Sequence, residues 1–246
     1  MNGNSTGRRL SCLVLLLGVA ALALRKGLYL LAVDGKGLLV RSHPLEVALA
    51  ALTAGALTFL LLAVRKVGGS ERYGDHHTAD LPAALGCVAA GAGILVTVLT
   101  ATPVMGGYLH TLWRVLGLAS PVCMLLAAFA RVRGKTPFFG FHVVVCLYFV
   151  MHIVTRYQLW SGDPQLQNYI FTLLGTMALM FFAFYTATLE AGYGNSRMNL
   201  GMGLAALYLC TAELARSSCP VLYLGSILWV LTELCSMKSL SAVENQ

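Results

Sequence analysis

The sequence predicts an all-α polytopic membrane protein, a transmembrane helical bundle of about eight spans, with seven as the alternative. Hydrophobic residues make up 58% of its 246 residues and charged residues only 11%, whereas soluble domains are about 25% charged. The stretches 81–113 and 164–189 contain no Asp, Glu, Lys or Arg, and a helix needs about 20 mainly apolar residues to cross a bilayer. These observations exclude an ordinary soluble enzyme, a disordered chain and a secreted disulfide scaffold.

The spans fill the chain, so we expect a single transmembrane helical domain over residues 1–246. Arg8 and Arg9 precede the first apolar run as in a signal peptide, but we expect an uncleaved helix because the rest of the chain is polytopic. Pro44 opens the second span, since proline suits the first position of a helix. The predicted spans are 10–31, 44–64, 81–102, 108–130, 137–155, 167–189, 199–215 and 219–237.

The last two predicted spans are short, and residues 216–220 join them. They form either one tight hairpin or two tilted, partly re-entrant helices. Small residues recur at helical spacing in 44–64, 81–102 and 199–215, and small residues let helix backbones approach closely. We therefore expect these three helices to be buried, or else to line a ligand cavity, while the Phe-rich helix 167–189 presents bulk to lipid.

The distribution of bases predicts a multi-pass cell-membrane protein with both termini in the cytoplasm. Ten Lys and Arg residues fall on the N-terminal side of the predicted spans and six on the other side, and cytoplasmic loops carry the excess of bases. The net charge of +7 is explained by these loop bases, so the expected partner is the lipid bilayer and not nucleic acid. Glu190 is expected to mark the cytoplasmic interface.

No cofactor or metal site is predicted. His142 and His152 lie ten residues apart, which is about 280° around a helix, so they face different directions. Asp75, His76, His77 and Asp80 cluster in one loop, but adjacent histidines cannot easily share one ion. We expect a solvated loop that ends in a helix cap there.

Four charged residues within predicted spans are candidate ligand-binding residues, since ionisable groups in a membrane are costly and often functional. Arg25 lies toward the end of the first span, where it either snorkels to the interface or contacts an anion. Arg114 lies inside the fourth span and needs an acceptor such as Glu213 or a backbone carbonyl. Glu213 has a second possible partner in Arg216, three residues away. Glu233 must be protonated or paired if its helix is straight.

The first quarter of the chain resembles uncharacterised polytopic membrane proteins of bacteria. The resemblance rests on Arg25 at the end of the first helix, on the loop residues Asp34, Gly35, Lys36, Gly37 and Leu38, and on His43 followed by Pro44. It implies a polytopic helical fold. That family carries no assigned activity, so the resemblance implies no site residues.

Three functions remain open on the sequence. The leading prediction is a small-solute transporter subunit or membrane-embedded substrate-binding component, with another membrane protein or a separate energising subunit as partner. The alternative is a sensory or scaffold module that binds another membrane protein, and the third is an intramembrane lipid-modifying enzyme. Convergence of at least three of the four charged candidates on one enclosed pocket would favour solute binding. Local pairing against filled helix interfaces would favour the scaffold.

Overall fold

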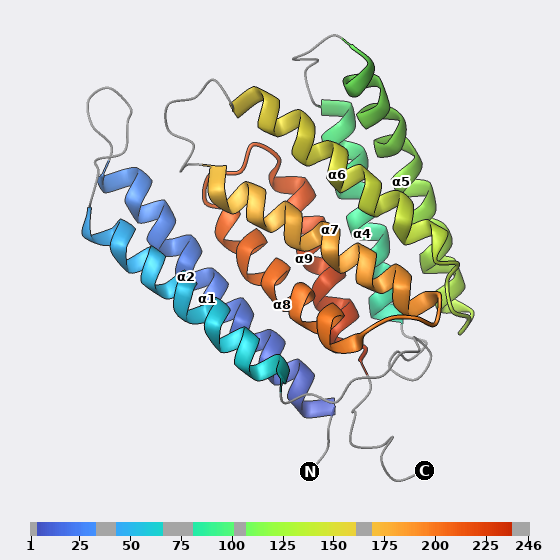
Figure 1. The fold of residues 1–246 in the computed structure, drawn as a ribbon, viewed down its shortest axis with the longest axis horizontal. Coiled ribbons are helices and arrows are strands. Elements are labelled where there is room, and N and C mark those ends of the chain that lie inside the picture. Colours follow the sequence, from blue (N-terminus) through green and yellow to red (C-terminus); the bar gives the residue numbers. More distant parts are fainter. Residues whose placement is uncertain (1–3, 33–42, 66–80, 101–106, 161–168, 238–246) are drawn as a thin grey trace.

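The computed structural model describes residues 4–32, 43–65, 81–100, 107–160 and 169–237, and this part of the chain is all-α (Figure 1). Its helices match the predicted spans to within a few residues at most boundaries, as expected for long apolar segments bounded by polar loops. They are α1 (Asn4–Leu31), α2 (Pro44–Arg65), α4 (Leu81–Thr100), α5 (Tyr108–Val132), α6 (Gly140–Trp160), α7 (Ile170–Glu190), α8 (Ser196–Glu213) and α9 (Pro220–Cys235).

Six of the described helices, α1, α2, α4, α5, α6 and α7, are long and apolar enough to cross a membrane. The helix α9 is apolar but has only 16 residues, which corresponds to about 24 Å at the usual rise per residue. The helix α8 has 18 residues with Arg197, Asn199 and Glu213 among them, and these polar groups lower its hydropathy. The described residues thus form eight helices at the places of the eight predicted spans, and six of these helices are long and apolar enough to span a membrane.

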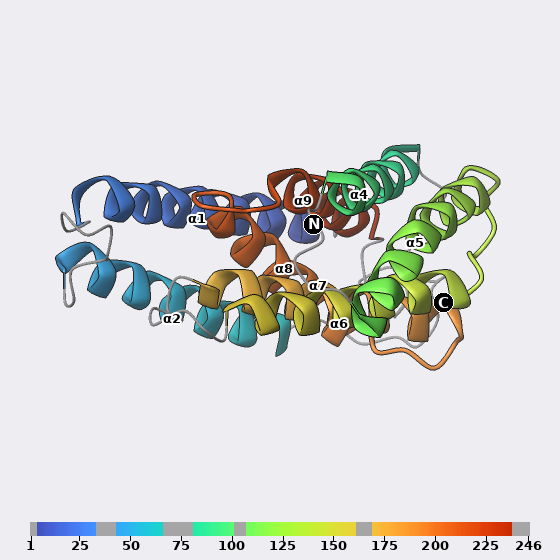
Figure 2. The same ribbon diagram turned by 90° about the horizontal axis from the view of Figure 1, so that it is seen from above.

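The helices form two rough layers with α8 between them (Figure 2). One layer contains α1, α9 and α4, and the other contains α2, α7 and α6, while α5 closes one end of the molecule against α4 and α6. The helices alternate in direction, so α1 begins and α9 ends at the same end of the bundle (Figure 1). Thirteen of the 18 residues of α8 are buried, which makes this helix the centre of the core.

Glycines set the most extensive helix interface, between α4 and α9. A Cβ atom added at Gly93 would lie 2.7 Å from the Val221 carbonyl oxygen, and one added at Gly225 would collide with the carbonyl oxygen of Ala89. The two backbones are thus too close for any side chain at these positions. This agrees with the burial predicted for 81–102, because small residues permit such close packing.

The predicted burial of the second span is wrong. Only Leu49, Ala56 and Leu60 of α2 are buried, and nothing lies within 4 Å of a Cβ added at Gly55. The reason is position: α2 lies at the edge of the bundle, where it packs mainly on α1 and α8. Ala51, Ala54 and Gly55 are therefore exposed.

The prediction for the Phe-rich helix holds in part. Phe181 and Phe184 of α7 are exposed on its outer face. Phe182 is instead fully buried, and its ring packs edge-on against Trp229 with the centroids 5.0 Å apart. Because α7 packs against both α6 and α8, one of its faces must enter the core.

Candidate functional site

The four charged candidates do not meet at one place. Arg25 and Glu213 contact each other at the end of the bundle where α1 and α8 end. Glu233 lies near the end of α9, at the opposite end of the molecule (Figure 1). Arg114 is exposed on α5. The candidates therefore fall into two separate buried clusters and one outward-facing side chain.

The first cluster, here called the Arg25 cluster, comprises Arg25, Thr172 and Glu213. The Arg25 Nη1 atom lies 2.5 Å from Glu213 Oε2 and also donates to the Ala212 carbonyl oxygen at 3.1 Å. The Thr172 hydroxyl donates to Glu213 Oε1 at 2.5 Å. Both charged side chains are only 3% exposed. Each carboxylate oxygen of Glu213 thus has a donor, which is what a buried charge requires.

The partners predicted for Glu213 are wrong. Arg25 binds its carboxylate because α1 packs along α8, whereas α5, which carries Arg114, packs on α4 and α6. Arg216 lies beyond the end of α8, and its guanidinium stands over the Tyr29 ring with 4.6 Å between Cζ and the centroid. Neither snorkelling nor an external anion is needed to account for Arg25.

The second cluster, here called the Glu233 cluster, comprises Arg131, His142, Glu190 and Glu233. The Arg131 Nη2 atom lies 2.6 Å from Glu233 Oε1, and His142 Nδ1 lies 2.9 Å from Glu190 Oε2. Glu190 also lies close enough to Arg131 and Glu233 to interact with them electrostatically. All four side chains are at most 3% exposed. The pairing of Glu233 agrees with the expectation that its carboxylate is protonated or paired.

Sequence reasoning missed three members of the Glu233 cluster. Arg131 was assigned to a loop, but α5 continues to Val132 and carries Arg131 into the helix. Glu190 was expected at the interface, yet its side chain is 0% exposed. One signal in the sequence could have found them. Consecutive helices alternate in direction, so the same end of the bundle holds the C-terminal ends of α5, α7 and α9 and the N-terminal end of α6.

The two histidines of α6 have different neighbours, as their spacing predicts. The His142 ring stacks on Trp229 of α9, with the centroids 5.7 Å apart. His152 accepts a hydrogen bond at Nδ1 from Trp113 Nε1 of α5 at 3.3 Å. Within the described residues, no three His, Cys, Asp or Glu side chains are grouped to hold a metal ion. The loop residues 75–80 lie outside the described part of the chain.

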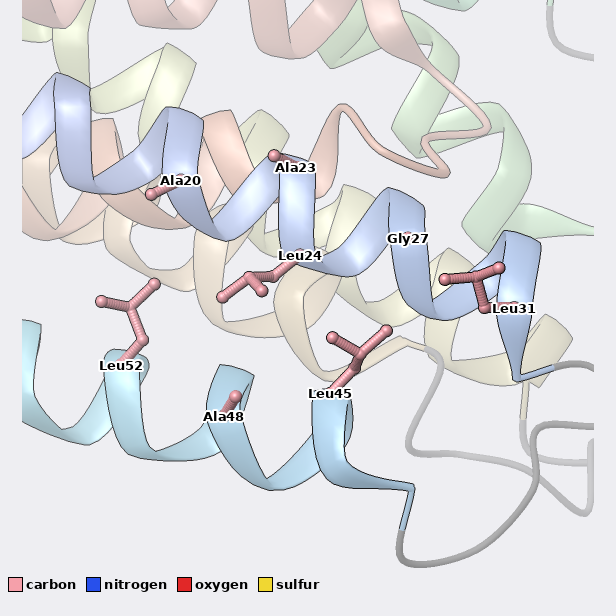
Figure 3. A pocket seen from close by; sticks show the side chains of 8 residues that line it. All are labelled: Ala20, Ala23, Leu24, Gly27, Leu31, Leu45, Ala48 and Leu52. Carbon is pink, nitrogen blue, oxygen red and sulfur yellow. The ribbon is translucent and has the colours of Figure 1, made fainter.

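An apolar groove of about 840 Å³ runs between α1 and α2 (Figure 3). The side chains of Leu24, Leu45 and Leu52 extend into the space between the two helices, and small residues lie between them. The groove is open to the outside. Its lining residues are Ala20, Ala23, Leu24, Gly27, Leu31, Leu45, Ala48 and Leu52.

The six long apolar helices indicate a multi-pass integral membrane protein, and the buried charges of Arg25, Glu213, Arg131 and Glu233 lie in pairs within it. Comparison with known protein families, with curated proteins and with solved structures finds no match to this chain. The resemblance of its first quarter to uncharacterised bacterial membrane proteins therefore stays a prediction. Residues 34–38, which carry part of that resemblance, lie outside the described residues.

Proposed function

We propose that this integral membrane protein is a scaffold or sensory module that binds another membrane protein within the bilayer. The observation that carries the proposal is the local pairing of its buried charges. Arg25 with Glu213, and Arg131 with Glu233, form short contacts inside filled helix interfaces. Such pairs hold neighbouring helices together, and they engage the charges of these four residues within the protein.

The geometry gives less support to solute transport, the leading prediction from the sequence. A transport site needs polar groups that reach a common cavity near the middle of the membrane. Here Arg25 and Glu233 belong to clusters at opposite ends of the bundle, and Arg114 is exposed. No observation in the described residues favours a separate energising subunit.

The intramembrane enzyme is also disfavoured. Polar groups do converge in each cluster, but Glu213 is held by Arg25 and Thr172, and Glu190 is enclosed beside His142. At 3% exposure or less, these groups offer a lipid substrate no path to them. A reacting atom must come within hydrogen-bond distance of a catalytic group.

The groove between α1 and α2 is the surface that we assign to the partner, and the occupant that we propose is a transmembrane helix. Both helices are poorly covered by the rest of the protein: 17% of the apolar stretch of α2 is buried, the lowest share among the six candidate spans, and 28% of that of α1, against 56% for α4. Small residues at Ala20, Ala23, Gly27 and Ala48 line the groove. Such residues permit a further helix to approach closely.

Site-specific photo-crosslinking in the native membrane tests this assignment. A photoreactive residue replaces Leu52, which lines the groove, or Ala54, which is exposed on α2 and does not line it. We expect a discrete protein adduct from position 52 and none from position 54. The variant Ala48→Trp should abolish that adduct by filling the groove, while Ala54→Trp should leave it intact.

Two outcomes would count against the proposal. Adducts to lipid alone from position 52 would show that the groove faces only the bilayer. Equal protein adducts from positions 52 and 54 would show contact without a defined surface. Either outcome would mean that the groove is no defined binding surface for a partner protein, and the scaffold proposal would lose its support.

A further inference from the structure

The Glu233 cluster contains buried polar atoms whose hydrogen bonding is incomplete. His142 Nε2 and Glu190 Oε1 are both buried without a hydrogen-bond partner in the described part of the chain. The Arg25 cluster differs, since both oxygens of Glu213 accept hydrogen bonds. Buried polar groups are nearly always satisfied, so a specific exception calls for an explanation.

Among the residues that the structure describes, the charges around Glu190 do not balance if its carboxylate is ionised beside a neutral imidazole. Arg131, a cation that interacts with Glu190, directly contacts Glu233 at 2.6 Å, and Glu233 contributes a negative charge of its own. A neutral His142 that donates Nδ1–H to Glu190 would leave the pair with one net negative charge. The Glu190 side chain is 0% exposed, and an uncompensated buried charge is very costly.

We propose that His142 and Glu190 form a buried proton-binding site that holds a second proton, so that the pair carries no net charge. The proton lies between Nδ1 and Oε2, which are 2.9 Å apart. Either the ring is a cation beside a carboxylate, or a carboxylic acid donates to a neutral ring. Nε2 carries a proton in both forms.

The other groups that face this site come from three helices. Cys87 of α4 lies close enough to the His142 ring to interact with it electrostatically. Arg131 comes from α5 and Glu233 from α9. Trp229 of α9 covers the ring face, with 12° between the planes. The site is sealed by these side chains, so proton exchange requires the helix ends to open.

His152 provides an internal control on the same helix. Its Nδ1 accepts the indole N–H of Trp113 at 3.3 Å, so that nitrogen carries no proton. The ring of His152 is therefore neutral. Both histidines are 2% exposed, and only His142 faces a carboxylate.

Nitrogen-15 NMR of the full chain, labelled at histidine and held in lipid nanodiscs, measures the protonation of each ring directly. At neutral pH we expect Nε2 of His142 to be protonated and Nδ1 to be either protonated or hydrogen-bonded to a carboxylic acid, which infrared spectroscopy detects. His152 should show a bare Nδ1. A His142 ring with one proton beside an ionised Glu190 would overturn the proposal.

Two conservative variants separate proton binding from a purely structural hydrogen bond. Glu190→Gln removes the carboxylate, so it should release the second proton and leave a neutral pair that still folds. His142→Gln leaves the carboxylate without its partner and should lose folded protein at a temperature where Glu190→Gln retains it. If both variants lose the same amount of folded protein, the contact between His142 and Glu190 is a structural hydrogen bond and not a proton-binding site. If neither variant folds, the assigned His142 signal of the unaltered chain still decides the question.

Discussion

The pairing of Arg25 with Glu213 predicts that the loss of either residue destabilises the protein, because the buried charge of the other residue is then uncompensated. Replacing Glu213 by Gln removes the charge that faces Arg25 Nη1 at 2.5 Å. The guanidinium then keeps the Ala212 carbonyl oxygen at 3.1 Å and the Phe171 ring, whose centroid lies 4.8 Å from Cζ. Neither contact neutralises a buried cation. Replacing Arg25 by Met leaves the opposite problem, a buried carboxylate held by one hydroxyl.

The size of the effect follows from the burial of the pair. Removing one partner of a buried ion pair costs about 3–5 kcal/mol, because the other charge is left uncompensated. For a chain of this size that corresponds to a fall in melting temperature of roughly 6–20 °C. Replacing both residues by Met removes both charges. It leaves the Thr172 hydroxyl without its acceptor and the Ala212 carbonyl oxygen without the Arg25 donor, and an unsatisfied buried group costs about 1–3 kcal/mol.

The assay is thermal unfolding of the purified variants in nanodiscs of fixed lipid composition at one scan rate. We expect Arg25→Met and Glu213→Gln to be strongly destabilised, and Arg25→Met with Glu213→Met to recover most of the loss. A double variant as unstable as the worse single variant would refute the pairing argument. If the single variants have the melting temperature of the unaltered chain, the pair does not stabilise the fold, and both residues remain candidates for ligand binding.

The remaining predictions concern packing and the other charged residues. Gly225→Ala should cost about 1–3 kcal/mol, because the added Cβ meets the α4 backbone, whereas Gly55→Ala meets nothing within 4 Å and should unfold like the unaltered chain in the same assay. Arg114→Gln should change stability by less than about 0.5 kcal/mol, since the side chain is exposed. Glu233→Gln leaves the buried Arg131 guanidinium without its carboxylate contact and should cost about 3–5 kcal/mol in thermal unfolding.

Much of the local structure follows from the sequence. Long apolar runs that lack charges form helices within a few residues of the predicted bounds, because a backbone in an apolar medium must satisfy its own hydrogen bonds. The glycines and alanines of α4 were correctly expected at an interface. The need of Glu233 for a partner was also predictable, since a carboxylate cannot remain alone inside the bundle.

The choice of partners was decided by tertiary structure. Glu213 pairs with Arg25, 188 positions away in the chain, and not with Arg216 on its own turn. Glu233 pairs with Arg131, 102 positions away. These contacts depend on α1 packing along α8 and on α5, α7 and α9 ending at one end of the bundle. No local pattern encodes which helices become neighbours.

The error at α2 has the same origin. In water, an apolar face must be buried, so hydrophobicity identifies the side of a helix that enters the core. In a bilayer the lipid is as apolar as the protein interior, so composition does not distinguish the two faces. The small residues of α2 suit a helix interface, yet the fold leaves α2 at the edge with a groove beside α1. The sequence alone thus determines the helices and their polar requirements, while only tertiary packing decides which faces meet protein and which meet lipid.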